Sequence, residues 1–285
     1  MNRQQWIVAG SGILLLFSLY FFGRTKPHAK GTALAEAPVQ DHADHAEAMG
    51  IEDILRQAKQ RLSPAQATRV TALENSLSRG DLVTRKINLY GQLAAYWKDS
   101  AKVYEPYIWY LGEKAKLENS EKNLNFAAHS YLEELRGVSD PALKRWMAIQ
   151  AKDLFTRSLE LNPANDSAKV GLGSTYFFGA GGEVSPMEGI MSIREVASKD
   201  STNLFAQFML GYGGMISGQL DKAAQRFETV LRRDPENTEA VFLLAETYER
   251  LGDKEKALQW YETGRSRVSN PEMLKALEDK MNSLK

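Results

Sequence analysis

The 285-residue sequence contains no cysteine and no excess of charge of either sign. Without cysteine the chain has no disulfide, no thiolate metal ligand, no cysteine nucleophile and no acylated cysteine. Lysine plus arginine and aspartate plus glutamate number 36 each, so the formal net charge is zero. A nucleic-acid-binding protein generally carries a basic excess that neutralises phosphates. This balance therefore argues against binding of bulk DNA or RNA.

The sequence also lacks the motifs of common enzyme classes. The glycine-rich segment at 179–183 has neither the third glycine of a dinucleotide fingerprint nor the lysine of a phosphate-binding loop. His129 has no partner near it in sequence, and we interpret it as a packed or capping residue. Paired acids such as Glu133 and Glu134 are interpreted as solvated helix faces. We therefore predict a non-enzymatic protein with no catalytic residue, no cofactor and no metal site.

One long apolar run lies near the N-terminus. Residues 4–23 contain no charged side chain, and residues 6–22 are almost wholly apolar. A helix of this apolar length spans about 25 Å, near the lower limit for the roughly 30 Å hydrocarbon core of a bilayer. Trp6 and Tyr20 would lie at the two interfaces. We predict a transmembrane anchor over 1–24, in contact with the membrane through residues 5–23.

A cleaved signal peptide is the alternative, because Ala33 and Ala35 have the small-x-small form of a cleavage site. This site lies far beyond the apolar run and behind three basic residues, which favours an uncleaved anchor. Those basic residues favour a cytoplasmic C-terminal domain, whereas an exported domain is the commoner arrangement for such anchors. We predict a single-pass protein of the inner cell membrane with a periplasmic folded part, and the opposite topology stays open.

A polar segment follows the anchor. Residues 25–50 are rich in Ala, Pro, Asp, Glu and His and show no apolar periodicity, which predicts a flexible linker. Within it, 41–47 combines two histidines with three acidic residues, a set that could hold a divalent metal. A disordered ligand set must be ordered on binding and fixes no geometry. We therefore interpret this segment as a solvated acidic tether.

An internal period of 34 residues is the decisive pattern in the rest of the sequence. From Met49 onward, helical patterns follow one another with short polar breaks and no convincing strand. Pairs of similar residues separated by 34 positions are Leu210 and Leu244, Gly218 and Gly252, Ala223 and Ala257, and Phe227 and Tyr261. A period of 34 is the length of a helix–turn–helix tetratricopeptide unit.

At these positions the chain resembles the tetratricopeptide repeat family, whose pattern runs Leu-Gly-x-x-Tyr, Ala-x-x-x-Phe and Pro. The matching residues are Leu172, Gly173 and Tyr176; Leu210, Gly211, Ala223, Phe227 and Pro235; Leu244, Tyr248, Ala257 and Tyr261; and, upstream, Ala151, Phe155 and Pro163. The small residues allow close helix approach, the aromatic residues fill gaps and the prolines end second helices. The resemblance implies an all-α fold, a right-handed α-solenoid of helix–turn–helix repeats after the transmembrane helix.

The resemblance covers residues 140–271, with departures. In the unit beginning near Asp166, Gly189 and Ile193 arrive four residues late because 178–185 lengthens the turn, and Ser201 replaces the closing proline. Upstream, 51–139 is predicted to be a divergent helical region, either degenerate repeats or a cap, with helices over 51–63, 64–78, 81–99, 102–118 and 121–136. Residues 272–285 are predicted to form a C-terminal capping helix that begins near Pro271.

The family geometry implies a binding groove lined by the first helix of each unit. The inward-looking residues would be Phe177, Phe178, Phe205, Phe208, Tyr212, Met215, Glu239, Phe242, Glu246, Glu249 and Arg250. Such a surface would suit a peptide that carries apolar anchors and some positive charge. The alternative is that some of these aromatic residues pack between units. Two successive glycines at 213–214, inside a first helix, predict a close approach of another helix or of a ligand.

These features together predict a membrane-anchored scaffold or adaptor that binds a protein or peptide partner through the groove of its repeats. Two alternatives stay open. One is a chaperone-like holdase or assembly factor for envelope proteins, which a methionine-rich adaptable surface would favour. The other is a structural protein that self-assembles through the ends of the solenoid. The sequence does not identify the partner.

Overall fold

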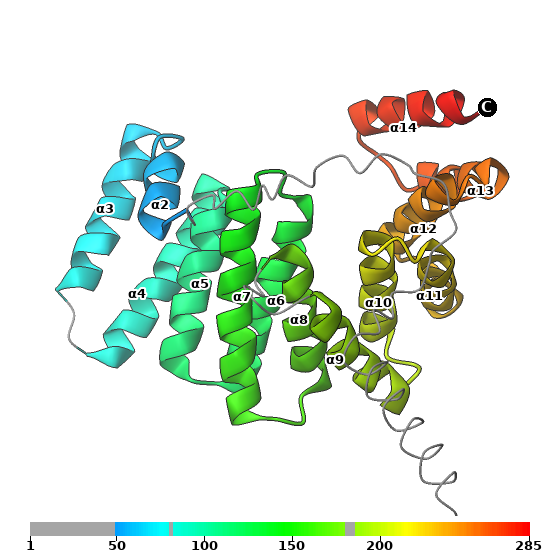
Figure 1. The fold of residues 1–285 in the computed structure, drawn as a ribbon. Coiled ribbons are helices and arrows are strands. Elements are labelled where there is room, and N and C mark those ends of the chain that lie inside the picture. The colour runs from blue at the N-terminus through cyan, green and yellow to red at the C-terminus, as the bar shows by residue number, and fades with distance from the viewer. Residues whose placement is uncertain (1–48, 80–81, 180–185) are drawn as a thin grey trace, which may run out of the picture. The chain divides into compact units, whose positions relative to one another are not determined.

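Short polar turns divide the chain into a succession of helices (Figure 1). The structure is a computed structural model that describes residues 49–79, 82–179 and 186–285, all within one compact unit. Its helices are α2 (Ile51–Lys59), α3 (Pro64–Ser78), α4 (Val83–Ala95), α5 (Tyr104–Glu118), α6 (Glu121–Gly137), α7 (Pro141–Leu161), α8 (Asp166–Thr175), α9 (Pro186–Lys199), α10 (Leu204–Ile216), α11 (Leu220–Arg233), α12 (Thr238–Leu251), α13 (Lys254–Arg265) and α14 (Pro271–Leu284). The described residues include no strand, which confirms the all-helical prediction for them; the right-handed sense of the solenoid stays a prediction.

The predicted helix bounds agree closely with the structure in the N-terminal half. The principal difference is in the third helix, where α4 gives way to a π-helix, η1 (Tyr96–Ala101), instead of running as one α-helix to residue 99. None of the described helices is both long enough and apolar enough to cross a bilayer. The predicted anchor at 1–24 and nearly all of the predicted linker at 25–50 lie outside the described residues.

Neighbouring helices pair into successive hairpins: α4 with α5, α6 with α7, α8 with α9, α10 with α11 and α12 with α13. The helix α14 packs on α13 and buries Met281 and Leu284 there. The first helices α6, α8, α10 and α12 also pack one on the next, and we call this row the inner helices. The predicted boundary between 139 and 140 falls between α6 and α7, which form one hairpin. The repeat-like pairing therefore begins upstream of that boundary.

An asparagine caps each of the last three inner helices. The side-chain oxygens of Asn165, Asn203 and Asn237 each accept a hydrogen bond from the backbone N–H three residues later, at 2.9–3.0 Å. The backbone N–H of each asparagine also donates to the carbonyl three residues earlier. From 165 to 203 is 38 residues and from 203 to 237 is 34, so the α8–α9 unit is four residues longer. This difference matches the predicted lengthening of its turn.

The α8–α9 hairpin closes over two glycines. A Cβ atom built on Gly189 would lie 2.2 Å from the carbonyl oxygen of Gly173, and one on Gly173 would lie 2.7 Å from the oxygen of Gly189. Any larger residue would therefore force the two backbones apart. Gly189 stands where the family pattern expects alanine. The close approach of the α8 and α9 backbones explains why the residue here is glycine.

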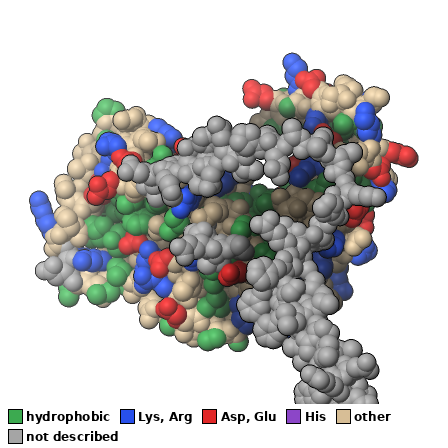
Figure 2. Space-filling model, viewed as in Figure 1, with side chains coloured by type: hydrophobic (Ala, Val, Ile, Leu, Met, Phe, Trp, Pro, Cys, Tyr) green, Lys and Arg blue, Asp and Glu red, His purple; other side chains and the backbone are tan. Residues whose placement is uncertain are grey.

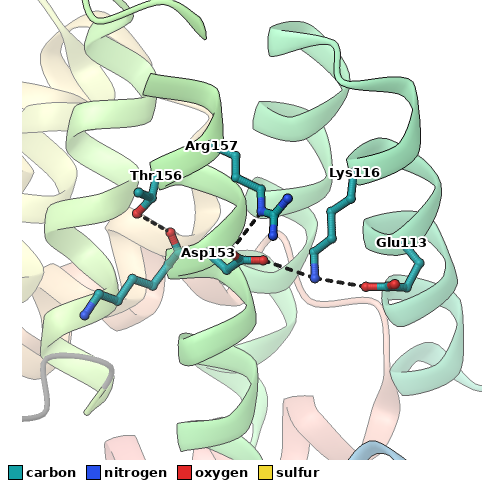
Figure 3. Close-up of polar contacts among 6 residues, drawn as sticks. Glu113, Lys116, Asp153, Thr156 and Arg157 are labelled. Atoms are coloured by element: carbon teal, nitrogen blue, oxygen red, sulfur yellow. Dashed lines mark hydrogen bonds and ion pairs between the residues drawn. The ribbon is translucent and has the colours of Figure 1, made fainter. Parts of the chain in front are cut away.

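Charged residues lie mainly at the surface, where they are interspersed by sign over the face shown in Figure 2. One network links two outer helices, α5 and α7 (Figure 3). Lys116 Nζ lies 2.9 Å from a Glu113 oxygen and 3.1 Å from an Asp153 oxygen, and Asp153 also pairs with Arg157 at 3.0 Å. The lysine sits over the Trp109 ring at 5.6 Å. Each charge of the network therefore has an opposite charge beside it.

Candidate partner-binding surface

A cavity of about 290 Å3 lies among the inner helices α6, α10 and α12. Its lining combines aromatic and aliphatic side chains with two acids, a cation, an amide and a histidine: His129, Leu132, Glu133, Arg136, Leu204, Phe205, Phe208, Asn237 and Glu239. Four of these nine residues are apolar and five are polar or charged, so the cavity offers both apolar contacts and groups that can fix the orientation of a bound side chain.

An ion pair bridges one side of this cavity. Arg136 Nε, at the end of α6, lies 2.7 Å from one Glu239 oxygen, at the start of α12, and Arg136 NH2 donates to the other oxygen at 3.1 Å. The same guanidinium lies 5.9 Å from the centre of the Phe208 ring. The pair thus links the first and last inner helices in the row, across the helix that carries Phe208. Only the NH2 group donates a hydrogen bond to the carboxylate, and the contact of Nε is one of charge.

A histidine forms the opposite side of the cavity. The ring of His129 meets the rings of Phe155 and Phe205 edge-on, each at 5.1 Å between centroids. Its Nε2 lies 2.8 Å from the hydroxyl oxygen of Ser167 on α8. Burial, together with a smaller effect of the charge of Arg136, lowers the pKa of His129 to about 4. At neutral pH the imidazole is therefore uncharged.

The contact between His129 and Ser167 has the spacing of a nucleophile and its general base. An effective base has a pKa near the working pH, and a value of about 4 makes this imidazole a weak proton acceptor at neutral pH. The serine lies on an inner helix and its hydroxyl serves to hold the ring of His129 in place. The arrangement orients a neutral, partly exposed aromatic edge toward the cavity.

Three of the predicted groove residues meet in this cavity: Phe205, Phe208 and Glu239. Tyr212 lies near the cavity, because two residues that line it, Arg136 and Glu239, interact electrostatically with the Tyr212 hydroxyl. The Tyr212 ring also lies 5.5 Å from the ring of Phe178. Burial raises the pKa of Tyr212, the arginine opposes this rise, and the glutamate adds to it.

The remaining predicted residues lie elsewhere. Phe242 packs toward Gly264 of α13, where a built Cβ would be 2.6 Å from the Phe242 ring. Glu249 accepts hydrogen bonds from Tyr261 at 2.9 Å and from Lys280 of α14 at 2.6 Å. Arg250 donates to the carbonyl of Met215 at 2.9 Å, so it ties α12 to α10. Glu246 is exposed.

The predicted groove residues also differ in how much of each side chain is exposed. Phe178, Phe208 and Met215 are each less than 9% exposed, so they belong largely to the packed interior rather than to an open groove. Phe177 is half-buried, and a built Cβ on Gly213 would lie 2.9 Å from its ring, which explains that helical glycine by close packing. Phe205 and Tyr212 are half-buried and Glu239 is exposed. Of these three, Phe205 and Glu239 line the cavity.

Comparison with protein families relates the C-terminal part of the chain to a known repeat. Residues 215–279 match the family model of the tetratricopeptide repeat. This segment carries the tetratricopeptide pattern. The matched segment runs from the end of α10 into α14 and covers less than a quarter of the chain.

Solved structures of tetratricopeptide and related proteins resemble the chain at low sequence identity. YrrB, described as a tetratricopeptide protein with an unusual peptide-binding site, is 17% identical over 73% of this chain and 98% of its own, with a TM-score of 0.41. MamA from Desulfovibrio magneticus RS-1, from residue 41 to its end, is 18% identical over 66% of this chain and 95% of its own, with a TM-score of 0.42. No curated protein matches the sequence.

The sequence analysis missed the contribution of α6 to the cavity of the inner helices. His129, Glu133 and Arg136 line the cavity from α6. The partner of Arg136 lies 103 residues away in the chain, and no local pattern signals such a contact. The repeated asparagine caps are visible in the sequence, where an alanine follows three residues after each of Asn165, Asn203 and Asn237. This pattern could have located the start of each inner helix.

Proposed function

We propose that this tetratricopeptide repeat protein is a non-enzymatic adaptor that binds a segment of a partner protein on its inner helices. The cavity bordered by Phe205, Phe208 and the Arg136–Glu239 pair carries this proposal. Tetratricopeptide repeats typically mediate contacts between proteins. The cavity has room for one or two side chains, and the half-buried Phe205 offers an apolar contact at its edge.

The chemistry of the cavity narrows the kind of segment. An apolar side chain would pack against Phe205 and the edge of His129, which is neutral at physiological pH. A cationic side chain beside it would meet the exposed carboxylates of Glu239 and Glu246 on α12. Partner segments with one aromatic or aliphatic anchor followed by lysine or arginine fit this arrangement.

Site-specific crosslinking in cells tests the adaptor function. A photo-reactive amino acid replaces Phe205 in the full-length chain, and, in a separate variant, the exposed Gln259 on the second helix of a hairpin. We expect a discrete protein adduct from position 205 that is absent from position 259. Equal adducts at both positions, or none at 205 in a chain that retains its helicity, would reject the inner surface as the binding site.

We also propose that residues 5–23 anchor the protein in the inner membrane with the repeats on the periplasmic side. The uncharged run from 4 to 23, with Trp6 and Tyr20 near its ends, supports this proposal. The repeats would then hold a partner at the membrane surface, within reach of the linker at 25–50.

The absence of cysteine makes the topology directly measurable. Asn282→Cys, at an exposed position of α14, and separately Gln4→Cys, are labelled in intact cells with a membrane-impermeant maleimide. A periplasmic domain predicts labelling at 282 before lysis and at 4 only after lysis. The reverse pattern would place the repeats in the cytoplasm, and labelling of both positions in intact cells would exclude a single membrane crossing.

A further inference from the structure

A second cavity, of about 610 Å3, lies between the outer helices α9 and α11, with α10 as its floor. It shares no lining residue with the cavity of the inner helices. Leu210 and Gly214 contribute to the floor, and α9 and α11 supply the two walls. We call this cavity the outer cleft. Its volume falls within the range of cavities that hold a ligand or a few side chains of a peptide.

The charged residues that line the outer cleft are all cations. Arg194 projects from α9, and Lys222 and Arg226 project from α11, while no carboxylate belongs to the lining. The nearest acids in sequence, Glu195 and Asp221, are both outside it. In a chain whose charges sum to zero, three lining cations without an acid form a local excess of positive charge.

These cations also lack acidic partners among the described residues. Arg226 NH1 donates to the amide oxygen of Gln207 at 2.6 Å, and Lys222 Nζ donates to Gln219 at 2.9 Å. Both acceptors are neutral, and the guanidinium of Arg194 makes no ion pair or hydrogen bond with a described residue. Elsewhere in the described part, cations such as Lys116 and Arg136 do meet carboxylates. Because Arg226 is half-buried, leaving its charge uncompensated costs free energy that an incoming anion would recover.

An apolar contact lies beside this positive charge. Met187 and Ile190 line the cleft from α9, and Met187 is 50% exposed. A flexible thioether next to fixed cations favours a ligand that has both apolar and anionic groups. A free inorganic anion would use only the cationic half of the cleft.

We propose that the outer cleft is a second docking surface, which takes a segment of a partner protein that combines acidic and apolar side chains. Its carboxylates would pair with Arg194, Lys222 and Arg226, and an apolar side chain would pack on Met187 and Ile190. The proposal is independent of the inner surface, because the segment expected there carries positive charge. A protein with both surfaces could hold two different segments at once.

Fluorescence anisotropy with defined peptides tests the outer cleft. The full-length chain is titrated into a labelled peptide that alternates glutamate with leucine, into a second with lysine in place of glutamate, and into a third with serine in place of leucine. We expect saturable binding of the first peptide that weakens as salt is raised, because surface charges are screened. The other two peptides should bind at least about tenfold more weakly.

Charge reversal then assigns the binding to the cleft. The double variant Arg194→Glu/Lys222→Glu should bind the acidic peptide at least about tenfold more weakly. A control, Arg85→Glu/Lys122→Glu, makes the same change in net charge at exposed positions outside the cleft and should change affinity by less than about twofold. Equal thermal unfolding of both variants would show that each retains the fold.

Four outcomes would overturn the proposal. They are no saturable binding of the acidic peptide, equal binding of the lysine peptide, an equal loss in the control variant, and equal binding of the serine peptide. The last would show a simple anion site without the apolar contact. None of these results bears on the inner surface, which is tested by different variants.

Discussion

Arg136 and Glu239 stand 103 residues apart in the sequence, yet the arginine Nε lies 2.7 Å from a glutamate oxygen. The arginine side chain is 20% exposed and the glutamate side chain 43% exposed, so water screens the pair only in part. The contact joins α6 to α12 over Phe208 of α10. It therefore couples the two ends of the inner row through the candidate site itself.

We expect a measurable coupling between these two residues in a double-mutant cycle. Arg136→Ala, Glu239→Ala and the double variant should give a coupling of roughly 0.5–1 kcal/mol in the free energy of unfolding, smaller at high salt. The exposed pair Asp53 and Arg56, within α2, is the control and should give about 0.3 kcal/mol. Denaturant unfolding measures both. A coupling for the long-range pair that is no larger than the control's would show that it does not connect the units.

His129 should make stability depend on pH between about 4 and 6.5. Its pKa in the folded chain, about 4, is below the ordinary value of 6.5, so the unfolded state binds more protons between these values. Stability is therefore lost as the pH falls through this window, by up to about 3 kcal/mol. His129→Gln keeps a hydrogen-bonding group without the charge, and should be less sensitive than the parent to a change from pH 7 to pH 5.

Nuclear magnetic resonance supplies an independent check on the same histidine. The midpoint of its imidazole titration should lie near pH 4, so the resonance should stay close to the neutral position down to about pH 5. A midpoint near pH 6.5 for this resonance would contradict the burial of the ring, whatever the unfolding data show.

Gly189→Ala should destabilise the fold by roughly 1–3 kcal/mol, because the added methyl group would meet the carbonyl of Gly173 at 2.2 Å. Gly137→Ala, near the end of α6, is the matched control, since a Cβ there has no neighbour within 4 Å. The control should cause no loss of stability. Thermal unfolding followed by circular dichroism compares the two. A fully stable Gly189→Ala protein would mean that α8 and α9 are farther apart than described.

Loss of one asparagine cap should cost about 1 kcal/mol. Asn203 accepts a hydrogen bond from the N–H of Ala206 at 3.0 Å, and Asn203→Ala leaves that donor without its partner. Asn203→Asp retains an acceptor in the same place and should be close to neutral. Denaturant midpoints at constant slope report the difference. Equal losses in the two variants would show that the side-chain amide, rather than the capping oxygen, matters at this position.

Much of the fold was predictable, because it depends on local patterns. The 34-residue spacing from Leu210 to Leu244, and the small residues opposite aromatic ones, place the last hairpins without knowledge of long-range contacts. The candidate site was less predictable. Phe205 and Phe208 lie about one turn apart in the same apolar helix. Phe205 is nevertheless half-buried, whereas Phe208 is buried, with only 7% of its surface exposed.

The difference between these two phenylalanines comes from residues distant in the chain. Phe208 packs on Phe227 of its own hairpin at 5.8 Å, while Phe205 meets His129 of α6. A helical periodicity identifies the face that points inward, but it does not tell which residues another unit covers. Glu249 illustrates the same limit, because its partner Lys280 belongs to α14, beyond the repeat.

The most direct test of the adaptor function is the affinity of the crosslinked partner's segment for variants of the inner surface. Isothermal titration with the full-length chain compares Phe205→Ala and Glu239→Ala with Gln259→Ala, and thermal unfolding confirms that each variant folds. If the inner helices bind the partner, each of the first two variants loses about tenfold or more in affinity and the third loses less than about twofold. Unchanged affinity in folded Phe205→Ala and Glu239→Ala proteins would contradict the account.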